Sequence, residues 1–413
     1  MSAFAKEFSA GWREVVGAMI GIACGFTGFS PLQSFFFRAL ELDFGWSKTA
    51  AAISLIALPI TALFLPVAGL LLDRFGVRRV ALFSTLAFAA CFILLSAMNG
   101  QLGMFYAAFI ALSVLGIATG PISYTRAVAT RFQASRGTAL AIALLGSAIA
   151  GMILPQALAA VFASGGWRAG YQFMAIWALV GGVLAVLMIR PSDQGEQSTG
   201  VKTGDSIGEA VRTVPFWVLG VAIFCVSLAG LGFISQLQSI VIEKGFAPER
   251  APLILSVLAA AVFTSRLVVG WALDTFSAER VAGISFALAG VGMLVWMFGD
   301  PTLMTAILGT MLLGLCIGAE LDFMSFFCAR LFGLLHYGAV YGALSMFFYT
   351  GAAAGGITFG VIHDRMGAYS AALAVATTFL FVAAILFLTL RSASIRAIQA
   401  TNAGMAPHAR GAT

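Results

Sequence analysis

The stretch GLLLDRFGVRR, residues 69 to 79, decides how the rest of the sequence is interpreted. Gly69 and Asp73 are one helical turn apart, and Gly76 stands between the acid and the basic pair Arg78-Arg79. A long apolar run precedes this stretch, so the glycine and the acid lie at the end of a predicted membrane-spanning helix, and a short basic loop follows.

The chain repeats itself after about 200 residues. Three landmarks recur: Gly45-Trp46 as Gly245-Phe246 after 200 positions, Gly69 to Asp73 as Gly270 to Asp274 after 201, and Arg131-Phe132 as Arg330-Leu331-Phe332 after 199. Three landmarks at one period indicate two halves of the same architecture. Parallel repeats of this kind are typical of transporters whose substrate site lies between the halves.

The composition excludes an ordinary soluble protein. Of the 413 residues, 61% are apolar and 10% are charged, and the mean hydropathy is +0.99. Soluble chains are about 45–50% apolar and about 25% charged. The net charge of +6 does not indicate nucleic-acid binding, because no basic tract is longer than Arg78-Arg79. The five cysteines lie in apolar runs without C-x-x-C spacing, so neither a disulfide framework nor a metal site is expected.

Apolar runs separated by charged residues, prolines and glycines predict twelve membrane-spanning helices. The first six cover about 15–37, 50–72, 79–99, 103–127, 137–163 and 170–189, and the second six about 215–240, 252–273, 280–299, 302–328, 338–362 and 369–390. We therefore expect an N-terminal six-helix bundle (1–190), a linker (191–213), a C-terminal six-helix bundle (214–395) and a tail (396–413).

The placement of the basic residues predicts the orientation. If both termini are cytoplasmic, the cytoplasmic loops contain most of the 23 lysines and arginines, as the positive-inside rule requires. We expect a multi-pass protein of the plasma membrane, in bacteria the inner membrane, with cytoplasmic termini, linker and tail.

Residues 69 to 79 resemble the G-x-x-x-D-R-x-G-R-R signature of the major facilitator superfamily. The resemblance implies a gate on the cytoplasmic side, in which Asp73 pairs across the interface between the halves or with a helix N-terminus. The gating candidates are Gly69, Asp73, Arg74, Gly76, Arg79 and the repeat counterpart Asp274. A basic loop that only fixes the topology is the alternative, but it requires neither the glycine nor the acid. The similar GVIHDRMG at 360–367 is interpreted as a helix-ending turn.

The loop before the fifth predicted helix resembles the monocarboxylate-porter branch of this superfamily. The residues in register with that branch are Phe132, Arg136, Ala139, Ala143, Gly146 and Ser147. Small residues at this density also favour close packing of helices in lipid, so a purely structural explanation remains open.

Arg266 is the main candidate for substrate binding. It lies in the eighth predicted helix, eight residues before Asp274 and so about 12 Å from the helix end. A charge at this depth costs about 2.5–3.5 kcal/mol on insertion scales and marks a pathway or an ion pair. Arg266-Leu-Val-Val-Gly270 resembles the R-x-x-x-G of monocarboxylate porters and the oxalate/formate exchanger, which implies that Arg266 binds a carboxylate. A structural ion pair with an acid of the tenth helix is the alternative.

The tenth predicted helix contains two acids, Glu320 and Asp322. Residues two apart on a helix point in different directions, so both cannot face one cavity. One of them could pair with Arg266 in the empty transporter and release it on protonation, which would couple a proton to an anion. A static network that fixes the tenth helix is the alternative.

Four further polar residues are weaker candidates for contacts with substrate: Arg126, Gln33, Gln236 and Tyr349. The sequence also departs from its relatives. Animal monocarboxylate porters have a lysine after the proline of the first helix, where this chain has Leu32-Gln33, and an aspartate one turn before the arginine, where it has Val262. Phe348 occupies the position of the second cation of the oxalate exchanger, which argues against a dicarboxylate.

The sequence thus predicts an all-α integral membrane protein with the major facilitator fold. The expected function is proton-coupled transport of a small organic anion, a monocarboxylate, by alternating access. Proton-coupled efflux of hydrophobic drugs or metabolites is the alternative. No nucleophile–base or metal-ligand set is present in the sequence, so we expect no enzyme activity, no cofactor and no metal. The expected partners are the substrate, a proton and the lipid bilayer, with no nucleic acid, and the expected state is a monomer. A receptor of the same fold that transports nothing also remains open.

Overall fold

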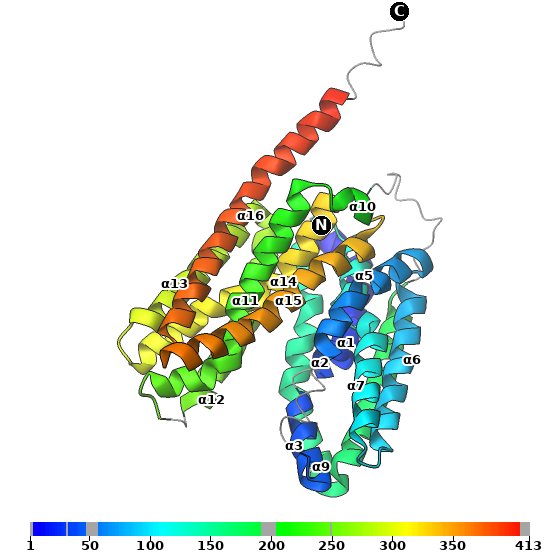
Figure 1. Ribbon diagram of the computed structural model, residues 1–413. Coiled ribbons are helices and arrows are strands. Elements are labelled where there is room, and N and C mark those ends of the chain that lie inside the picture. The colour runs from blue at the N-terminus through cyan, green and yellow to red at the C-terminus, as the bar shows by residue number, and fades with distance from the viewer. Residues whose placement is uncertain (1–2, 30–31, 47–56, 191–203, 248–249, 405–413) are drawn as a thin grey trace, which may run out of the picture. The chain divides into compact units, whose positions relative to one another are not determined.

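The computed structural model describes residues 3–29, 32–46, 57–190, 204–247 and 250–404 (Figure 1). Within these ranges the regular structure is helical, apart from one isolated bridge between Gly204 and Gly333. The prediction of an all-helical chain is therefore confirmed.

The first half of the chain consists of α1 (Ala3–Cys24), α2 (Phe26–Phe29), α3 (Gln33–Phe44), α5 (Ala57–Phe75), α6 (Val77–Ser96), α7 (Leu102–Leu115), the 3-10 helix η3 (Ile117–Thr119), α8 (Pro121–Arg131) and α9 (Arg136–Met188). The second half consists of α10 (Ile207–Ala210), α11 (Val214–Glu243), α12 (Ala251–Thr275), α13 (Ala278–Phe298), α14 (Leu303–Phe332), α15 (Tyr337–Met366) and α16 (Ser370–Gly404). Each of the twelve predicted segments falls on one or more of these helices. The start of the second predicted segment (50–56) and most of the predicted linker (191–203) lie outside the described residues.

Two predicted helices are interrupted where the sequence pattern suggested continuity. The first breaks at Gly25, where a Cβ atom would lie 2.0 Å from the carbonyl oxygen of Thr119. The fourth breaks around Gly120-Pro121, because proline has no N–H to continue a helix and favours the first helical position. The two breaks contact each other, since the Phe26 N–H donates to Thr119 Oγ1 at 2.9 Å. Apolar periodicity contains no signal for such paired interruptions.

The fifth and sixth predicted helices both lie within α9, as two helices that meet at a kink. Gly166 separates them with a left-handed φ of 68°, a conformation that glycine adopts without steric cost. A second left-handed glycine, Gly367 with φ 70°, follows the end of α15 at Met366, where the sequence predicted a helix-ending turn.

The contacts group the chain into two compact units that do not coincide with its two sequence halves. Unit 1 comprises the described residues of Met1–Ile207, Phe263–Asp274 and Leu321–Thr350, and unit 2 those of Gly208–Val262, Thr275–Glu320 and Gly351–Thr413. Parts of α12, α14 and α15 therefore belong to the unit that contains the first half.

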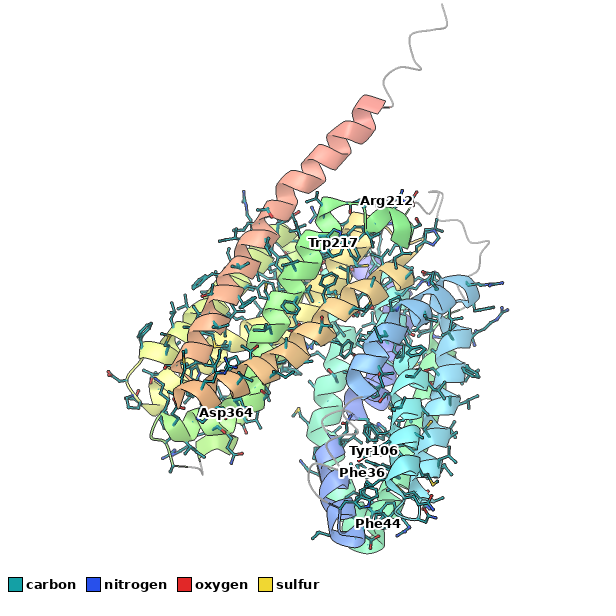
Figure 2. The ribbon with its side chains drawn as sticks, viewed as in Figure 1. Phe36, Phe44, Tyr106, Arg212, Trp217 and Asp364 are labelled. Carbon is teal, nitrogen blue, oxygen red and sulfur yellow. The ribbon has the colours of Figure 1, made fainter. Side chains whose placement is uncertain are left out.

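Unit 1 is built around α9, which packs against α1 and α6. Its core contains an aromatic cluster that includes Phe29, Phe36, Phe92 and Tyr171, and the Phe36 and Tyr171 rings stack at 4.1 Å. Figure 2 labels Phe36, together with Tyr106 and Phe44, which pack against the same cluster.

In unit 2, α16 packs against α13 and α11 (Figure 1). In the described part of the chain, eight helices are long and apolar enough to cross a membrane, with α9 counted once. This length and composition fit a protein that crosses the bilayer many times.

Candidate functional site

The side chains of Arg266 and Asp322 form a buried ion pair inside unit 1. Arg266 lies on α12, within the apolar segment Leu253–Thr275, and Asp322 lies on α14. The guanidinium Nη1 and the carboxylate Oδ2 are 3.0 Å apart, and the two side chains are 7% and 1% exposed. Each charge would be costly alone in an apolar segment, so the two stabilise each other.

The pair leaves hydrogen-bonding capacity unused. Arg266 Nε and Asp322 Oδ1 are both buried, and neither has a hydrogen-bond partner among the residues that the structure describes. A guanidinium has five N–H donors, of which a single carboxylate can accept only some. The site therefore retains a donor and an acceptor beside the ion pair.

Asp322, rather than Glu320, is the acid that reaches Arg266. The Glu320 carboxyl is also buried, with 4% exposure, and its residue groups with unit 2. The sequence left open which acid would pair with the arginine, because both lie at similar depth on α14. The direction of each side chain around the helix axis separates them.

Asp73, at the end of α5, caps the beginning of α15. Its two carboxylate oxygens accept hydrogen bonds from the backbone N–H groups of Gly338 at 3.1 Å and Ala339 at 3.0 Å. Asp73 also forms an ion pair with Arg126 on α8. We call this arrangement the Asp73 cap. A carboxylate at a helix N-terminus satisfies unpaired N–H groups and the positive end of the helix dipole.

Asp274 makes the corresponding contact at the end of α12. Its oxygens accept from the backbone N–H groups of Gly137 at 2.6 Å and Thr138 at 2.8 Å, at the beginning of α9. We call this arrangement the Asp274 cap. The two aspartates that the repeat places 201 residues apart thus perform the same task on two different helices.

The glycines that precede these aspartates allow the helices to approach closely. A Cβ atom on Gly69 would lie 2.0 Å from the carbonyl oxygen of Gly338, and one on Gly270 would lie 2.5 Å from the Cβ of Ala141. No residue with a side chain fits at Gly69 unless the two backbones separate.

A third carboxylate, which the sequence analysis did not single out, holds the segment before α9. Glu7 on α1 accepts from the backbone N–H groups of Gln133, Ala134 and Ser135 and from the Ser135 hydroxyl, at 2.8 to 3.4 Å. Burial raises the pKa of the Glu7 carboxyl, but these hydrogen bonds outweigh it and the pKa is lowered overall. An acid before an apolar run has no distinctive spacing, so the sequence offered no signal for this contact.

The other gating candidates have different surroundings. Gly76 precedes α6 with a left-handed φ of 81°. Arg74 and Arg79 are exposed, and the Arg74 guanidinium lies over the Phe75 ring at 5.3 Å. Among the described residues neither arginine has an ion-pair partner, whereas Arg126, a weaker candidate for substrate binding, is the partner of Asp73.

The remaining candidates divide between the two units. Gln33 is buried in unit 1, and its Nε2 has no hydrogen-bond partner within the described ranges. Gln236 belongs to unit 2, where its Oε1 accepts from the Tyr369 hydroxyl at 2.9 Å. Tyr349 packs edge-on against Phe348. Within unit 1, the predicted substrate contacts that the structure joins directly are Arg266 and Asp322.

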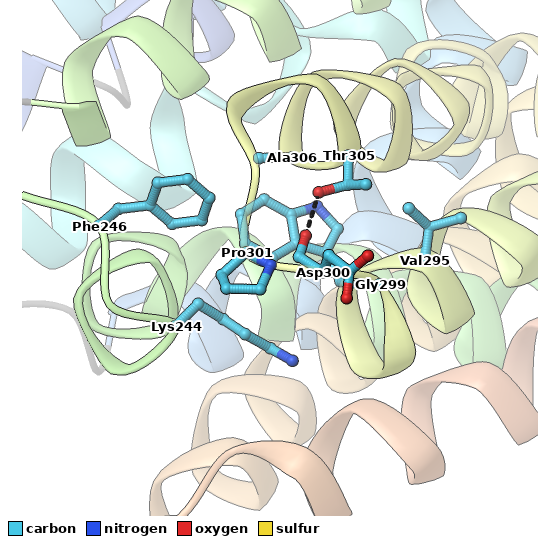
Figure 3. A pocket seen from close by; sticks show the side chains of 9 residues that line it. Lys244, Phe246, Val295, Gly299, Asp300, Pro301, Thr305 and Ala306 are labelled. Atoms are coloured by element: carbon cyan, nitrogen blue, oxygen red, sulfur yellow. Dashed lines mark hydrogen bonds between the residues drawn. The ribbon is translucent and has the colours of Figure 1, made fainter.

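Two cavities in the described structure contain none of these candidates. One, in unit 2, has a volume of about 10 Å³ and is lined by residues that include Lys244, Trp296 and Asp300 (Figure 3). It has room for about one water molecule. The other is an open groove of about 330 Å³ in unit 1, lined by residues that include Asp43, Phe162 and Trp167.

The long apolar helices define the class of a multi-pass membrane protein. The family model described as Major Facilitator Superfamily matches residues 18–275. The chain belongs to this superfamily, whose members are transporters rather than enzymes.

Solved transporter structures have the same fold. The fucose:proton symporter of E. coli is 15% identical and superposes with a TM-score of 0.72, over 91% of this chain and 96% of that one. A bacterial homologue of the iron transporter ferroportin, in an outward-facing state, is 16% identical with a TM-score of 0.73, over 92% of this chain and 98% of that one. The human organic anion transporter TETRAN is 14% identical with a TM-score of 0.69, over 91% and 99% of the two chains. No curated protein sequence matches the chain significantly.

Proposed function

We propose that this transporter moves a small organic monocarboxylate together with a proton, and that Arg266 binds the carboxylate. The observation that carries the proposal is the buried Arg266–Asp322 ion pair. A planar guanidinium can form two parallel hydrogen bonds with a carboxylate. In the absence of substrate, the Asp322 carboxylate pairs with the Arg266 guanidinium.

The chemistry of the pair supports coupling. Protonation of Asp322 removes its negative charge and frees Arg266, whose buried positive charge then requires another anion. A substrate carboxylate supplies that anion. Proton and substrate therefore favour the same state of the site, which is the condition for symport.

In this proposal the two caps control alternating access, the change between states open to one or the other side of the membrane. In this proposal the Asp73 and Asp274 caps lie on the cytoplasmic side, hold the helix beginnings there in the closed state, and break when that side opens. The topology has both termini in the cytoplasm, and the membrane is the plasma membrane, in bacteria the inner membrane. The functional unit is a monomer.

The solved relatives are compatible with this proposal at the level of fold. One of them is a fucose:proton symporter and another an organic anion transporter. At 14 to 16% identity, the substrates of these relatives do not indicate what this chain transports. The proposal of a monocarboxylate therefore depends on Arg266.

The test is uptake of radiolabelled monocarboxylates into proteoliposomes with and without an inward proton gradient. Wild-type protein should accumulate at least one monocarboxylate only when the gradient is present. Arg266→Ala should abolish uptake. Asp322→Asn should abolish gradient-driven accumulation while retaining exchange of labelled for unlabelled substrate, because a neutral amide leaves Arg266 free to bind the anion.

A double variant distinguishes binding from a structural ion pair. Arg266→Met with Asp322→Leu replaces both charges by apolar groups, a change that is often neutral or stabilising for the fold. We expect a folded protein with no uptake. If the double variant transports monocarboxylates at the wild-type rate, the pair is structural and the proposal is wrong. Gradient-driven export of hydrophobic cations by the wild type would instead support drug efflux.

A further inference from the structure

The open groove in unit 1 is not used by the proposed transport mechanism. It lies where α3 ends and α9 turns, and α3 packs against α9 (Figure 1). Its volume of about 330 Å³ is at the lower end of the range for small-molecule sites. The groove is lined by Ala39, Leu42 and Asp43 of α3 and by Phe162, Gly166 and Trp167 of α9. We refer to it as the Asp43 groove.

Aromatic side chains surround the groove at this end of unit 1. The Phe44 ring contacts the Trp46 and Trp167 rings, with centroids 5.2 and 5.5 Å apart. The Trp46 indole N–H donates to the carbonyl oxygen of Gly100, between α6 and α7, and Tyr106 packs against the same core (Figure 2). Tryptophan and tyrosine are enriched where a membrane protein meets the lipid headgroups. Their concentration at these helix ends indicates that the groove lies at that level.

Opposite charges stand together at the edge of the groove. Arg168 Nη1 is 3.5 Å from Asp43 Oδ2, and the two side chains are 50% and 46% exposed. Arg168 Nη2 donates to the carbonyl oxygen of Met98 at 3.4 Å. Both contacts are at the long limit for hydrogen bonds, and an exposed ion pair contributes little to stability. The guanidinium is therefore available to another anion.

Asp43 is held in place by one of its two oxygens. Oδ2 accepts the Trp167 indole N–H at 2.9 Å and also faces Arg168. Oδ1 has no hydrogen-bond partner within the residues that the structure describes. The carboxylate thus has a fixed position and an oxygen that can accept from a ligand.

These charges select the chemistry of the ligand. A phosphate pairs with a guanidinium and an ammonium with a carboxylate, so a headgroup that carries both groups satisfies Arg168 and Asp43 together. A headgroup with only a negative charge would be repelled by Asp43. A quaternary ammonium requires a free aromatic face, and the face of Trp167 is covered by the Arg168 guanidinium at 4.1 Å. A primary ammonium, which donates hydrogen bonds, fits Asp43 Oδ1.

The rest of the groove is apolar. Leu42 is 70% exposed, and Phe162 lies on the opposite wall, where its ring packs edge-on against Phe36 at 5.2 Å. Covering such surface with a hydrocarbon chain is favourable. A ligand with a charged headgroup and an apolar chain therefore matches both parts of the groove.

We propose that the Asp43 groove binds a phospholipid with a primary amine in its headgroup. The lipid phosphate pairs with Arg168, its ammonium donates to Asp43 Oδ1, and the first part of an acyl chain lies against Leu42 and Phe162. With both termini in the cytoplasm, as the sequence predicts, this lipid belongs to the leaflet on the opposite side. The site goes beyond the proposed function and does not depend on which substrate is transported.

Native mass spectrometry of the purified full-length protein tests the selectivity. The probes are phosphatidylethanolamine, phosphatidylcholine and phosphatidylglycerol with identical acyl chains, added in equal amounts. Wild-type protein should retain phosphatidylethanolamine in preference to the other two. Arg168→Gln should weaken this binding by about fivefold, the scale on which one basic residue near a membrane surface acts, whereas Arg168→Lys should retain most of it. The control Arg365→Gln, an exposed arginine of α15 in unit 2, should change nothing.

Asp43→Asn provides a second variant with a different signature. Its amide oxygen still accepts from Trp167, so the fold should be preserved, but the negative charge is gone. The preference should then move from phosphatidylethanolamine to phosphatidylglycerol, because the repulsion of an anionic headgroup is removed. A merely structural role of Asp43 predicts no such reversal. Melting temperatures verify that each variant is folded.

Photocrosslinking locates the bound lipid. Phosphatidylethanolamine with a diazirine near the start of one acyl chain should label peptides that contain residues 39–43 or 162–167. Equal binding of the three lipids by the wild type, wild-type selectivity in Asp43→Asn, or labelling confined to other peptides would each overturn the site. Displacement of the lipid by an equal concentration of soluble phosphoethanolamine would overturn the assignment to a lipid, because the groove would then recognise the headgroup alone.

Discussion

At the scale of single residues, Gly69 shows how one missing side chain determines a contact. The Gly338 carbonyl oxygen occupies the place that a Cβ would take, at 2.0 Å, and Asp73 reaches the N–H groups of Gly338 and Ala339 only because the two backbones meet there. The glycine and the acid therefore contribute to one structural contact between α5 and α15, which explains their spacing of one helical turn.

Gly69→Ala should separate α5 from α15 and weaken the Asp73 cap. Inserting a methyl group into a packed contact costs about 1–3 kcal/mol. We expect a lower melting temperature in detergent and slower uptake. Gly360→Ala on α15 is the matched control, since a Cβ there meets nothing within 4 Å. Equal melting temperatures for the two variants would contradict the close-packing explanation.

Glu7 should make stability depend on pH. Its hydrogen bonds lower the pKa of the folded state below the ordinary value of 4.5, so the stabilisation is present above that value and is lost as the pH falls through the folded pKa. Glu7→Gln should therefore lower the melting temperature at about pH 7 and make little difference at about pH 3. A difference between wild type and Glu7→Gln that grows on acidification would refute this assignment.

At the scale of helices, the sequence predicted which segments are helical but not where they break or what holds their ends. The run of apolar residues around Gly25 suggests one helix, and only the meeting of Phe26 with Thr119 fixes the interruption. Tyr337 and Tyr341 look like ordinary aromatic core residues in the sequence. The Tyr337 hydroxyl donates to Thr125 Oγ1 on α8, a contact that the sequence pattern does not indicate.

The native Cys328 can report on the Asp73 cap. It is fully buried on α14, with its sulfur 3.9 Å from the carbonyl oxygen of Tyr337. Asp73→Asn replaces a charged cap by a neutral one, and such contacts contribute about 0.3–1 kcal/mol each, or up to about 2 kcal/mol when partly buried. Cys328 should then react several times faster with N-ethylmaleimide, as measured by mass spectrometry of the labelled peptide.

The buried Cys225 on α11, in unit 2, is the internal control for this measurement. Its labelling rate should be the same in wild type and in Asp73→Asn. If both cysteines become more reactive together, the substitution loosens the whole protein. Unchanged labelling of Cys328 would show that the cap does not govern access to this part of the protein.

At the scale of the whole molecule, the sequence predicted the family and the architecture. Composition required a bilayer, and the superfamily match confirms a multi-pass membrane protein of this fold. The 200-residue repeat predicts two related halves, and this division stays a prediction. The substrate could not be predicted with the same certainty. In the proposed function the substrate depends on how a few side chains, Arg266 foremost, are directed within their helices, and apolar patterning contains no information about this.

Cotransport of one proton with one monoanion carries no net charge. Uptake by the wild-type protein should therefore respond to a pH gradient but not to an electrical potential imposed with valinomycin and potassium. A rate that rises with an inside-negative potential would require an additional positive charge per cycle. The same measurement on the Asp322→Asn variant provides the baseline, because exchange without a proton carries the anion in both directions.

The two caps are reciprocal. An aspartate from the first half of the sequence holds a helix of the second, and an aspartate from the second half holds a helix of the first. Neither half is complete when produced alone, because each would have one capping aspartate without its helix and one helix N-terminus without its capping aspartate. Two separately synthesised polypeptides, divided in the predicted linker, should therefore associate when expressed in the same membrane and restore transport. Either polypeptide expressed by itself should be degraded.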